Sequence, residues 1–417
     1  MLNRFTKINI KNYYILLPVI LLSALYSQDL ESKYNLEFNP NFSKQWWSQY
    51  NNYGQESSKI NFRYNGEYER NKTYYYFSVF ASKDRVDISE SFIKSQLFNN
   101  TYLKAGKYYR DFSLYLNDNL SSGSILISKN AEPMPKIGLI SSYSFQKNRA
   151  IDLYFGISHG IFKKSAIYKK APMLHEKFIY LNHRKNQNEF NIGIVHEAIW
   201  GGSTEAYGDF PDSFKDFLKI FISADGPLLD GEPHANALGN HLGIWDFSYT
   251  RKIDDKKLKI YYQHLFEDTS GLRFHNRTDG LWGLEFYNYI KNTNIVFEYL
   301  NTMNQDRDPP YVNESYYNHG EYQEGWSYKG YVLGNPFINA GQYSNLNPSK
   351  VLHFGFANNE MSKYSYQLLL SRKINTFDSI KYKIVFGKKI NKLFLDIFIV
   401  GEENQKKNVG VKIAYFL

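Results

Sequence analysis

Apolar and polar side chains alternate along most of the chain from about residue 59 onward, with a period of two. Within residues 151–158, for example, Ile, Leu, Phe and Ile alternate with Asp, Tyr, Gly and Ser, and residues 190–194, 295–299, 352–356 and 393–399 behave alike. Successive side chains of a strand point to opposite faces, so this period predicts strands with one apolar face. The runs are long and many end in Tyr, Phe or Trp, as the girdles of a transmembrane barrel require. We therefore predict an all-β chain, with an antiparallel up-and-down β-barrel over residues 59–417.

The last nine residues carry the same alternation. Val409, Val411, Ile413, Tyr415 and Leu417 are apolar and are separated by Gly410, Lys412, Ala414 and Phe416. We expect this segment to be the closing strand, because backbone groups that face lipid must be paired within the protein. The alternative is the final strand of a soluble sheet. At roughly 20–25 residues per strand and connection, the chain is long enough for about 16–18 strands.

The first 27 residues have the pattern of a secretory signal peptide. Arg4, Lys7 and Lys11 precede an apolar stretch over residues 13–25, and no acidic residue occurs before Asp29. The alternative is a buried first helix, which Pro18 disfavours. Residues 28–58 lack clear alternation, and we assign them to an N-terminal periplasmic segment. Cleavage after residue 27 removes three cations and no anion, so the mature charge falls from +9 to +6.

Two long connections interrupt the strands. In the first, over residues 200–240, Phe214, Phe217, Leu218 and Phe221 have helical spacing after Asp212, a potential N-cap. We predict a short helix near residues 212–221 whose apolar face packs into the barrel mouth. The second connection, over about residues 302–349, is rich in rings and glycines. Loops of this length are usually functional or disordered, and the rings argue against disorder. We expect such loops to occlude the lumen partly.

Composition narrows the class of protein further. Aromatic residues make up 18% of the chain, although the mean hydropathy is only −0.51. A disordered chain would lack the rings, and a helical membrane protein would contain repeated apolar runs of about 18 residues or more. The chain has no Cys, which excludes a disulfide scaffold and thiolate chemistry. The mature charge suits an anionic polymer or the phosphates of lipopolysaccharide.

Several blocks in one order resemble the capsule assembly Wzi family of outer-membrane proteins. They are LSSGSILISKNAEPMPKIGL (residues 120–139), HEAIWGG (196–202), FPDSFKDFLKIF (210–221), LGNHLGIWDFSY (238–249), FEDTSGLRFHNRTDGLWGLEF (266–286) and NHGEYQEGWSYKGYVLGNP (318–336). The resemblance implies a barrel of about 18 strands in the outer membrane, with a partly occluded lumen. It also implies a lectin-like role in holding capsular or exopolysaccharide at the cell surface. Enterobacterial members have a periplasmic helical bundle, for which residues 28–58 leave little room.

Polysaccharide recognition needs flat apolar faces for sugar C–H groups, and uronic acids favour Arg, which pairs with carboxylates through two hydrogen bonds. Two blocks supply such side chains, and we take seven as candidate glycan contacts on the extracellular side: Arg273, Arg277, Trp282, His319, Tyr322, Trp326 and Tyr328. We expect the two blocks to share one cleft, with rings on one wall and guanidinium groups on the other. The alternative is that these residues pack the loops together and plug the mouth.

Enzyme chemistry has weaker support. Asp230, Glu232, His234 and His241 match no ligand spacing typical of a metal site. Ser122, Ser124 and His196 lack a nucleophile elbow, and the segment 122–127 looks like the start of a strand. No phosphate-binding, dinucleotide or nucleic-acid motif occurs. We therefore predict a non-catalytic protein without metal or cofactor, whose partners are an anionic polysaccharide, outer-membrane lipid and lipopolysaccharide, and a polysaccharide exporter. The alternatives are a diffusion channel, since a large barrel can leave an aqueous lumen, and a lipid- or glycan-modifying enzyme.

Overall fold

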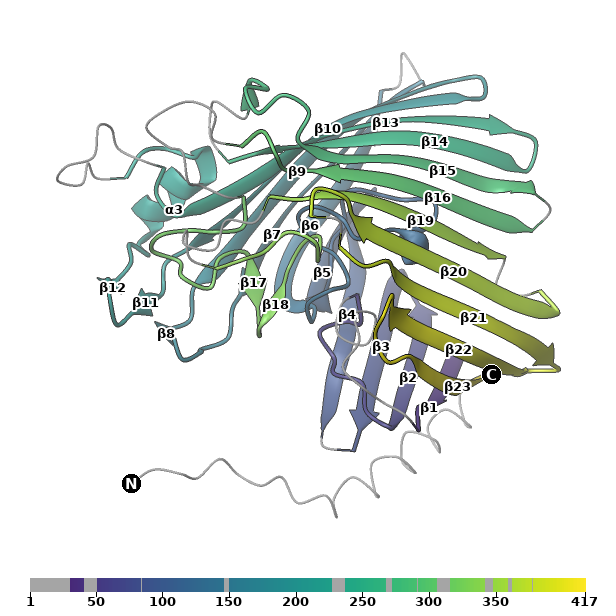
Figure 1. The fold of residues 1–417 in the computed structure, drawn as a ribbon. Helices are drawn as coiled ribbons and strands as arrows, with labels where there is room; N and C mark the ends of the chain where they lie inside the picture. Colours follow the sequence, from purple (N-terminus) through teal and green to yellow (C-terminus); the bar gives the residue numbers. More distant parts are fainter. Residues whose placement is uncertain are drawn as a thin grey trace, which may run out of the picture.

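One sheet of 18 antiparallel strands closes on itself in the computed structural model of the chain (Figure 1). The structure describes residues 31–40, 51–83, 85–145, 150–226, 237–267, 272–290, 292–305, 316–341, 348–358, 362–376 and 378–417. The first nine strands of the wall are β1 (Glu31–Phe38), β2 (Ile60–Arg70), β3 (Thr73–Ser82), β4 (Val86–Phe98), β5 (Thr101–Tyr108), β6 (Met134–Ser144), β7 (Ile151–Ile161), β9 (Met173–Lys185) and β10 (Asn188–Trp200). The other nine are β13 (Asn240–Ile253), β14 (Lys256–Phe266), β15 (Gly280–Ile290), β16 (Thr293–Asn301), β19 (Lys350–Asn358), β20 (Tyr364–Lys373), β21 (Lys381–Ile390), β22 (Leu393–Glu402) and β23 (Asn408–Phe416). The predicted barrel class and strand number are confirmed.

The barrel closes between its first and last strands. β23 pairs with β22 on one side and with β1 on the other, with Lys33 opposite Phe416 and Phe38 opposite Val411. The predicted closing strand is therefore confirmed. Assigning all of residues 28–58 to a periplasmic segment, with the barrel starting at residue 59, is wrong, because Glu31–Phe38 is a full strand of the wall. The expected signal peptide over residues 1–27 lies outside the described residues.

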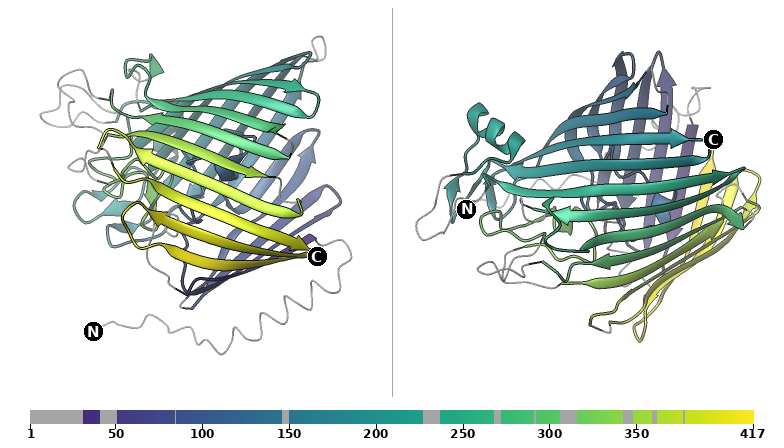
Figure 2. Two further views of the ribbon diagram at one scale, coloured as in Figure 1. Left: turned by 45° about the vertical axis from the view of Figure 1, so that its right-hand side comes forward. Right: turned by 90° about the horizontal axis from the view of Figure 1, so that it is seen from above.

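The connections divide by length between the two ends of the barrel (Figure 2). Short turns at residues 71–72, 99–100, 186–187, 254–255 and 391–392 lie at the end where β1 begins and β23 ends. The long connections 109–133, 201–239, 267–279 and 302–349 lie at the opposite end. Outer-membrane barrels have short periplasmic turns and long extracellular loops, so we call the long-loop end extracellular. Among the described residues, no helix is long and apolar enough to cross a membrane.

The two faces of the wall differ as the alternation predicts. Outward-pointing side chains are apolar and exposed, among them Ile179, Ile192 and Ile397. Inward-pointing side chains are often charged and buried, among them Asp246, Glu285, Glu298 and Asp396. An apolar exterior with a polar interior is the pattern of a barrel that is surrounded by lipid.

Smaller elements lie at the extracellular end. The helix α3 (Phe214–Ile222) is the only α-helix of four residues or more in the described part of the chain. A small sheet contains β8 (Tyr168–Lys170), β11 (Ser203–Thr204) and β12 (Gly208–Asp209), and a hairpin contains β17 (Ser327–Tyr328) and β18 (Tyr331–Val332). The predicted helix is therefore present, but its N-cap is Ser213, which forms a capping box with Asp216. Asp212, the predicted cap, instead pairs with Lys170.

The assignment of the two faces can be tested with one arginine on each face. Ile397→Arg places a charge in lipid near the middle of β22, at a cost of roughly 2–4 kcal/mol. Gln367→Arg lies on the inward face of β20, beside cavities of 460 and 400 Å³ in the lumen. We expect the first variant to lose most of its heat-modifiable folded form on unheated gels and the second to retain it. Equal folding of the two variants would contradict the assignment.

Candidate functional site

The segment of residues 109–133, which we call the plug, enters the lumen between β5 and β6. Carboxylates on the inner face of the wall hold its backbone. Glu285 accepts hydrogen bonds from the backbone N–H groups of Leu116 (3.1 Å) and Asn117 (2.6 Å). Glu298 accepts from the backbone N–H of Ser122 and from the hydroxyl of Ser121, both at 2.6 Å. The plug is thus bound to the wall through hydrogen bonds to charged groups, which are stronger than those between neutral groups.

Further contacts fix the plug on two sides of the lumen. Asp246 on β13 accepts a hydrogen bond from the hydroxyl of Ser113 at 2.7 Å. On the side of β19, Nε2 of His353 lies 2.6 Å from the carbonyl oxygen of Leu120. Gly355 permits this approach, because a Cβ there would lie 2.4 Å from the same oxygen. The wall and the plug are therefore complementary in shape as well as in hydrogen bonding.

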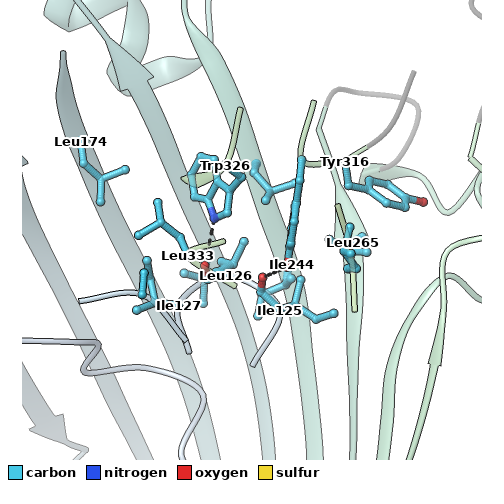
Figure 3. Close-up of a cluster of buried hydrophobic side chains, with 14 of the residues drawn as sticks. Ile125, Leu126, Ile127, Leu174, Ile244, Leu265, Tyr316, Trp326 and Leu333 are labelled. Atoms are coloured by element: carbon cyan, nitrogen blue, oxygen red, sulfur yellow. Dashed lines mark hydrogen bonds between the residues drawn. The ribbon is translucent and has the colours of Figure 1, made fainter. Parts of the chain in front are cut away.

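The loop of residues 302–349, which we call the long loop, locks onto the plug. The indole N–H of Trp326 donates to the carbonyl oxygen of Leu126 at 2.9 Å (Figure 3). Further hydrogen bonds join the segments, among them those from Asn130 Nδ2 to Val332 O (2.8 Å) and from Ser128 Oγ to Gly334 O (2.6 Å). Ile125, Leu126, Leu333 and other apolar side chains surround Trp326 in one buried cluster. The predicted occlusion of the lumen is confirmed.

The ring-bearing candidates lie inside this cluster. Trp326, Tyr322 and Tyr328 are buried, with 0%, 2% and 4% of their surface exposed. Tyr322 packs against Phe210 in a tilted arrangement with the ring centres 4.7 Å apart, and Tyr328 packs edge-on against Phe162. These three rings have no free face for a sugar. They pack the loops together, as the alternative interpretation of these residues predicts. The expected cleft with rings on one wall is not formed.

His319 shapes the turn that carries these rings. Its Nδ1 accepts hydrogen bonds from the backbone N–H groups of Glu321 (3.2 Å) and Tyr322 (3.1 Å). Burial, with a smaller contribution from His241, lowers the pKa of His319 to about 4. Because Nδ1 must be unprotonated to accept, the turn depends on the neutral imidazole.

The loop of residues 267–279, which we call the Arg loop, displays its cations differently. Arg273 and Arg277 are exposed, and Phe274 between them stacks on His264 with the ring centres 4.1 Å apart. His264 points to the outer face of β14, so the Arg loop folds over the rim of the barrel. The side chain of Asn276 is buried and donates to the carbonyl oxygen of Leu265 at 2.8 Å. The two guanidinium groups therefore extend from a fixed base.

Trp282 belongs to the outer surface of the barrel. It lies at an outward position of β15, is 38% exposed, and stacks on Tyr262 with the ring centres 3.8 Å apart. Its place near the extracellular end suits a ring of the interfacial girdle. The Arg loop and the long loop do meet, but through Tyr316, whose hydroxyl bonds to Asn276 (2.7 Å) and Asp279 (2.9 Å).

The enzyme and metal candidates are not brought together. Ser122 lies in the plug inside the barrel, whereas His196 points outward from β10 and contacts His241 at 2.8 Å. Asp230, Glu232 and His234 fall outside the described residues. Within the described ranges, no group of three metal-ligating side chains forms a site.

The sequence pattern does not predict the plug, and the expected strand start at residues 122–127 is wrong. Residues 122–127 form bends and irregular backbone without a strand, and they lie inside the lumen, where Ser122 contacts Glu298 and Ile125 contacts Gln263. Below the plug, toward the periplasmic end, the lumen holds a cavity of 720 Å³ lined by polar side chains, including Asn182, Arg184 and Lys257. The plug and the long loop thus occlude part of the lumen, which is hollow toward the periplasmic end.

A closed barrel with structured extracellular loops defines the chain as an outer-membrane protein of the occluded type. The chain belongs to the family described as capsule assembly protein Wzi, which matches residues 11–362. The resemblance in the sequence blocks is thereby confirmed, and with it a role in capsule assembly at the outer membrane.

Comparison with curated proteins finds no match. Solved structures that are similar include a mutant of the Rh. blastica porin (8% identity, 93% of this chain and 99% of that chain, TM-score 0.38). A loop L8 deletion mutant of OmpT from Vibrio cholerae (8%, 93% and 98%, 0.33) and CdiB from Acinetobacter baumannii (8%, 94% and 60%, 0.37) are also similar. Values this low carry no argument about function.

Removing the central ring should loosen the extracellular closure. Trp326→Ala leaves a cavity in a packed cluster and an unpaired carbonyl on Leu126, a local loss of about 3–5 kcal/mol. We expect the wild-type barrel to pass little current in a planar bilayer and the variant to show larger, fluctuating conductance. Trp282→Ala removes the same side chain from the outer face and serves as the control. If Trp326→Ala and Trp282→Ala conduct alike, the closure does not depend on this contact.

Acidification should have a related effect through His319. Since its pKa is about 4 in the folded protein and near 6.5 when unfolded, the folded state loses stability as pH falls through this window. At pH 5 the loss is about 2 kcal/mol, concentrated in the long loop. We expect channel openings to be more frequent at pH 5 than at pH 7. His319→Asn keeps an acceptor but does not titrate, so its openings should depend less on pH.

Proposed function

We propose that this protein holds capsular polysaccharide at the cell surface by binding it on the outside of the closed extracellular end. The observation that carries the proposal is the hydrogen-bonded lock between Trp326 and Leu126, around which the long loop and the plug form one packed body. A body of this kind presents a fixed surface to a polymer. The proposal assigns no reaction to the protein.

The Arg loop supplies the best-placed binding groups. Arg273 and Arg277 are exposed, and the anchoring of Phe274 and Asn276 limits the motion of their backbone. A guanidinium group pairs with a carboxylate through two parallel hydrogen bonds, which suits an acidic polysaccharide. The buried rings have a supporting role in this proposal, because they form the base on which the exposed loops rest.

A diffusion channel is the second function considered for such a barrel. The plug and its hydrogen bonds to Glu285 and Glu298 disfavour it, since they hold a segment of chain inside the lumen. The conductance of the wild-type barrel separates the two functions directly.

The binding proposal predicts a loss of polymer from cells that carry Arg273→Gln with Arg277→Gln. Both positions are exposed, so the folded, heat-modifiable barrel should be unchanged. In a deletion strain complemented with this variant, cell-bound polysaccharide should fall and released polysaccharide should rise, with the total constant. The loss should be greatest at low ionic strength, because exposed charge pairs are screened over about 10 Å at 0.1 M salt.

Arg251→Gln with Lys256→Gln provides the matched control. These cations are also exposed, but they lie at the periplasmic ends of β13 and β14. The control should retain polymer like the wild type. Equal retention by both double variants would refute the role of the Arg loop.

A further inference from the structure

The helix α3 packs on the outside of the barrel wall. Its ring Phe217 lies against His159 of β7, His175 of β9 and Trp200 of β10, with ring centres 5.2, 5.4 and 5.5 Å away. All three partners occupy outward positions, because their neighbours in the alternation, such as Ser158, Glu176 and Ile199, are buried on the inner face. The expectation that the helix packs into the barrel mouth is therefore wrong.

Both ends of α3 are fixed to this outer position. At the N-terminus, Ser213 and Asp216 form the capping box, and the preceding Asp212 pairs with Lys170 of β8. At the C-terminus, the ammonium group of Lys177 on β9 donates to the carbonyl oxygen of Phe221. A cation that satisfies a terminal carbonyl also interacts favourably with the helix dipole. The helix is thus held in place at both ends, and its exposed face does not result from fraying.

Only part of the apolar surface of α3 is covered by the wall. Ile220 is fully buried and Phe217 is half-buried against the wall. Phe214, Leu218 and Ile222 follow at intervals of four residues, and they are 75%, 50% and 71% exposed. Residues four apart form one stripe along a helix, so these three side chains make a continuous apolar surface that points away from the wall. Lys215 and Lys219 lie on the remaining, polar arc.

The exposed stripe continues the lipid-facing belt of the barrel. On β9, Ile179 and Leu181 are exposed outward positions that follow His175 toward the middle of the strand. At about 3.3 Å per residue, Ile179 lies roughly 13 Å from His175 along the strand, and the difference in depth is smaller because barrel strands are tilted. The helix therefore sits at the upper edge of the apolar belt, where acyl chains meet head groups.

We propose that α3 is an interfacial anchor, whose stripe of Phe214, Leu218 and Ile222 inserts among the acyl chains of the outer leaflet. Interfacial helices combine an apolar face with lysines on the polar face, and Lys215 and Lys219 then lie at the level of the lipid phosphates. The anchor is independent of polysaccharide binding. It would fix the depth of the small sheet of β8, β11 and β12, which is joined to the helix through Lys170.

The absence of Cys from the chain allows a direct test on the full-length protein. Leu218→Cys is labelled with bimane and the barrel is reconstituted in phosphatidylcholine vesicles that contain lipid with a nitroxide on the acyl chain. Leu114→Cys is the matched control, because Leu114 is equally an exposed leucine but lines the 720 Å³ cavity in the lumen. Lys215→Cys samples the polar arc of the same helix.

We expect the label at position 218 to emit at shorter wavelength and to be quenched by nitroxide lipid several-fold more strongly than the labels at 114 and 215. Iodide in the buffer should quench the other two labels more strongly. Ile222→Cys, at the last residue of the helix, provides a second reporter if the label at 218 impairs heat-modifiable folding. Quenching of the labels at positions 218 and 222 by iodide and not by lipid would overturn the proposal. Protection from both quenchers would also overturn it, since a protein partner or second copy would then cover the stripe.

Discussion

Pairing of backbone polar groups is the constraint on which the rest of the structure depends. In lipid an unpaired N–H or C=O group costs several kcal/mol, so a spanning sheet must close. Here closure requires β1, which pairs with β2 over all eight of its residues and with β23 over six of them. Tyr34, Leu36 and Phe38 point outward and Lys33, Asn35 and Glu37 point into the lumen. Without this strand, β2 and β23 would each present an unpaired edge.

A closed wall with a polar inner face creates a second requirement, because buried carboxylates are stable only with partners. Tyr180 and Tyr261 of the wall donate to Asp246 and Glu298, and the plug supplies N–H and O–H donors to all three carboxylates, Asp246, Glu285 and Glu298. The plug in turn lacks enough backbone pairing of its own, and the carboxylates satisfy it. The wall and the plug are therefore one hydrogen-bonded unit, and the long loop completes it by covering the apolar residues of the plug.

These dependences explain which features the sequence predicts. A period of two is a local signal, so the long strands, the barrel class and the closing strand were predicted correctly. In β1 the alternation is clear over only Tyr34–Phe38, which hid that strand. The partner of Trp326 lies 200 residues away in the chain, and no local pattern separates a buried ring from a sugar-binding one in a glycine-rich loop. Trp282 follows the apolar Leu281, so its outward position on β15 emerges only from the pairing of the strands. The helical spacing likewise predicted α3, but it could not say which side of the wall the helix covers.

The residues of the extracellular end fall into two groups, buried rings and exposed charged side chains. The rings of the long loop are buried in packing contacts, because a lumen of 18 strands is too wide for wall side chains alone to fill. The exposed chemistry is left to charged side chains on short, anchored loops, where Phe274 and Asn276 hold the backbone that carries Arg273 and Arg277. In the proposed function, such a surface would bind a polymer by adsorption along its length, without threading it through the barrel. Adsorption through several weak charge pairs on one repeating chain gains strength from their number, since each pair raises the effective concentration of the next. A fixed loop surface favours this, because a mobile loop would lose entropy at each contact.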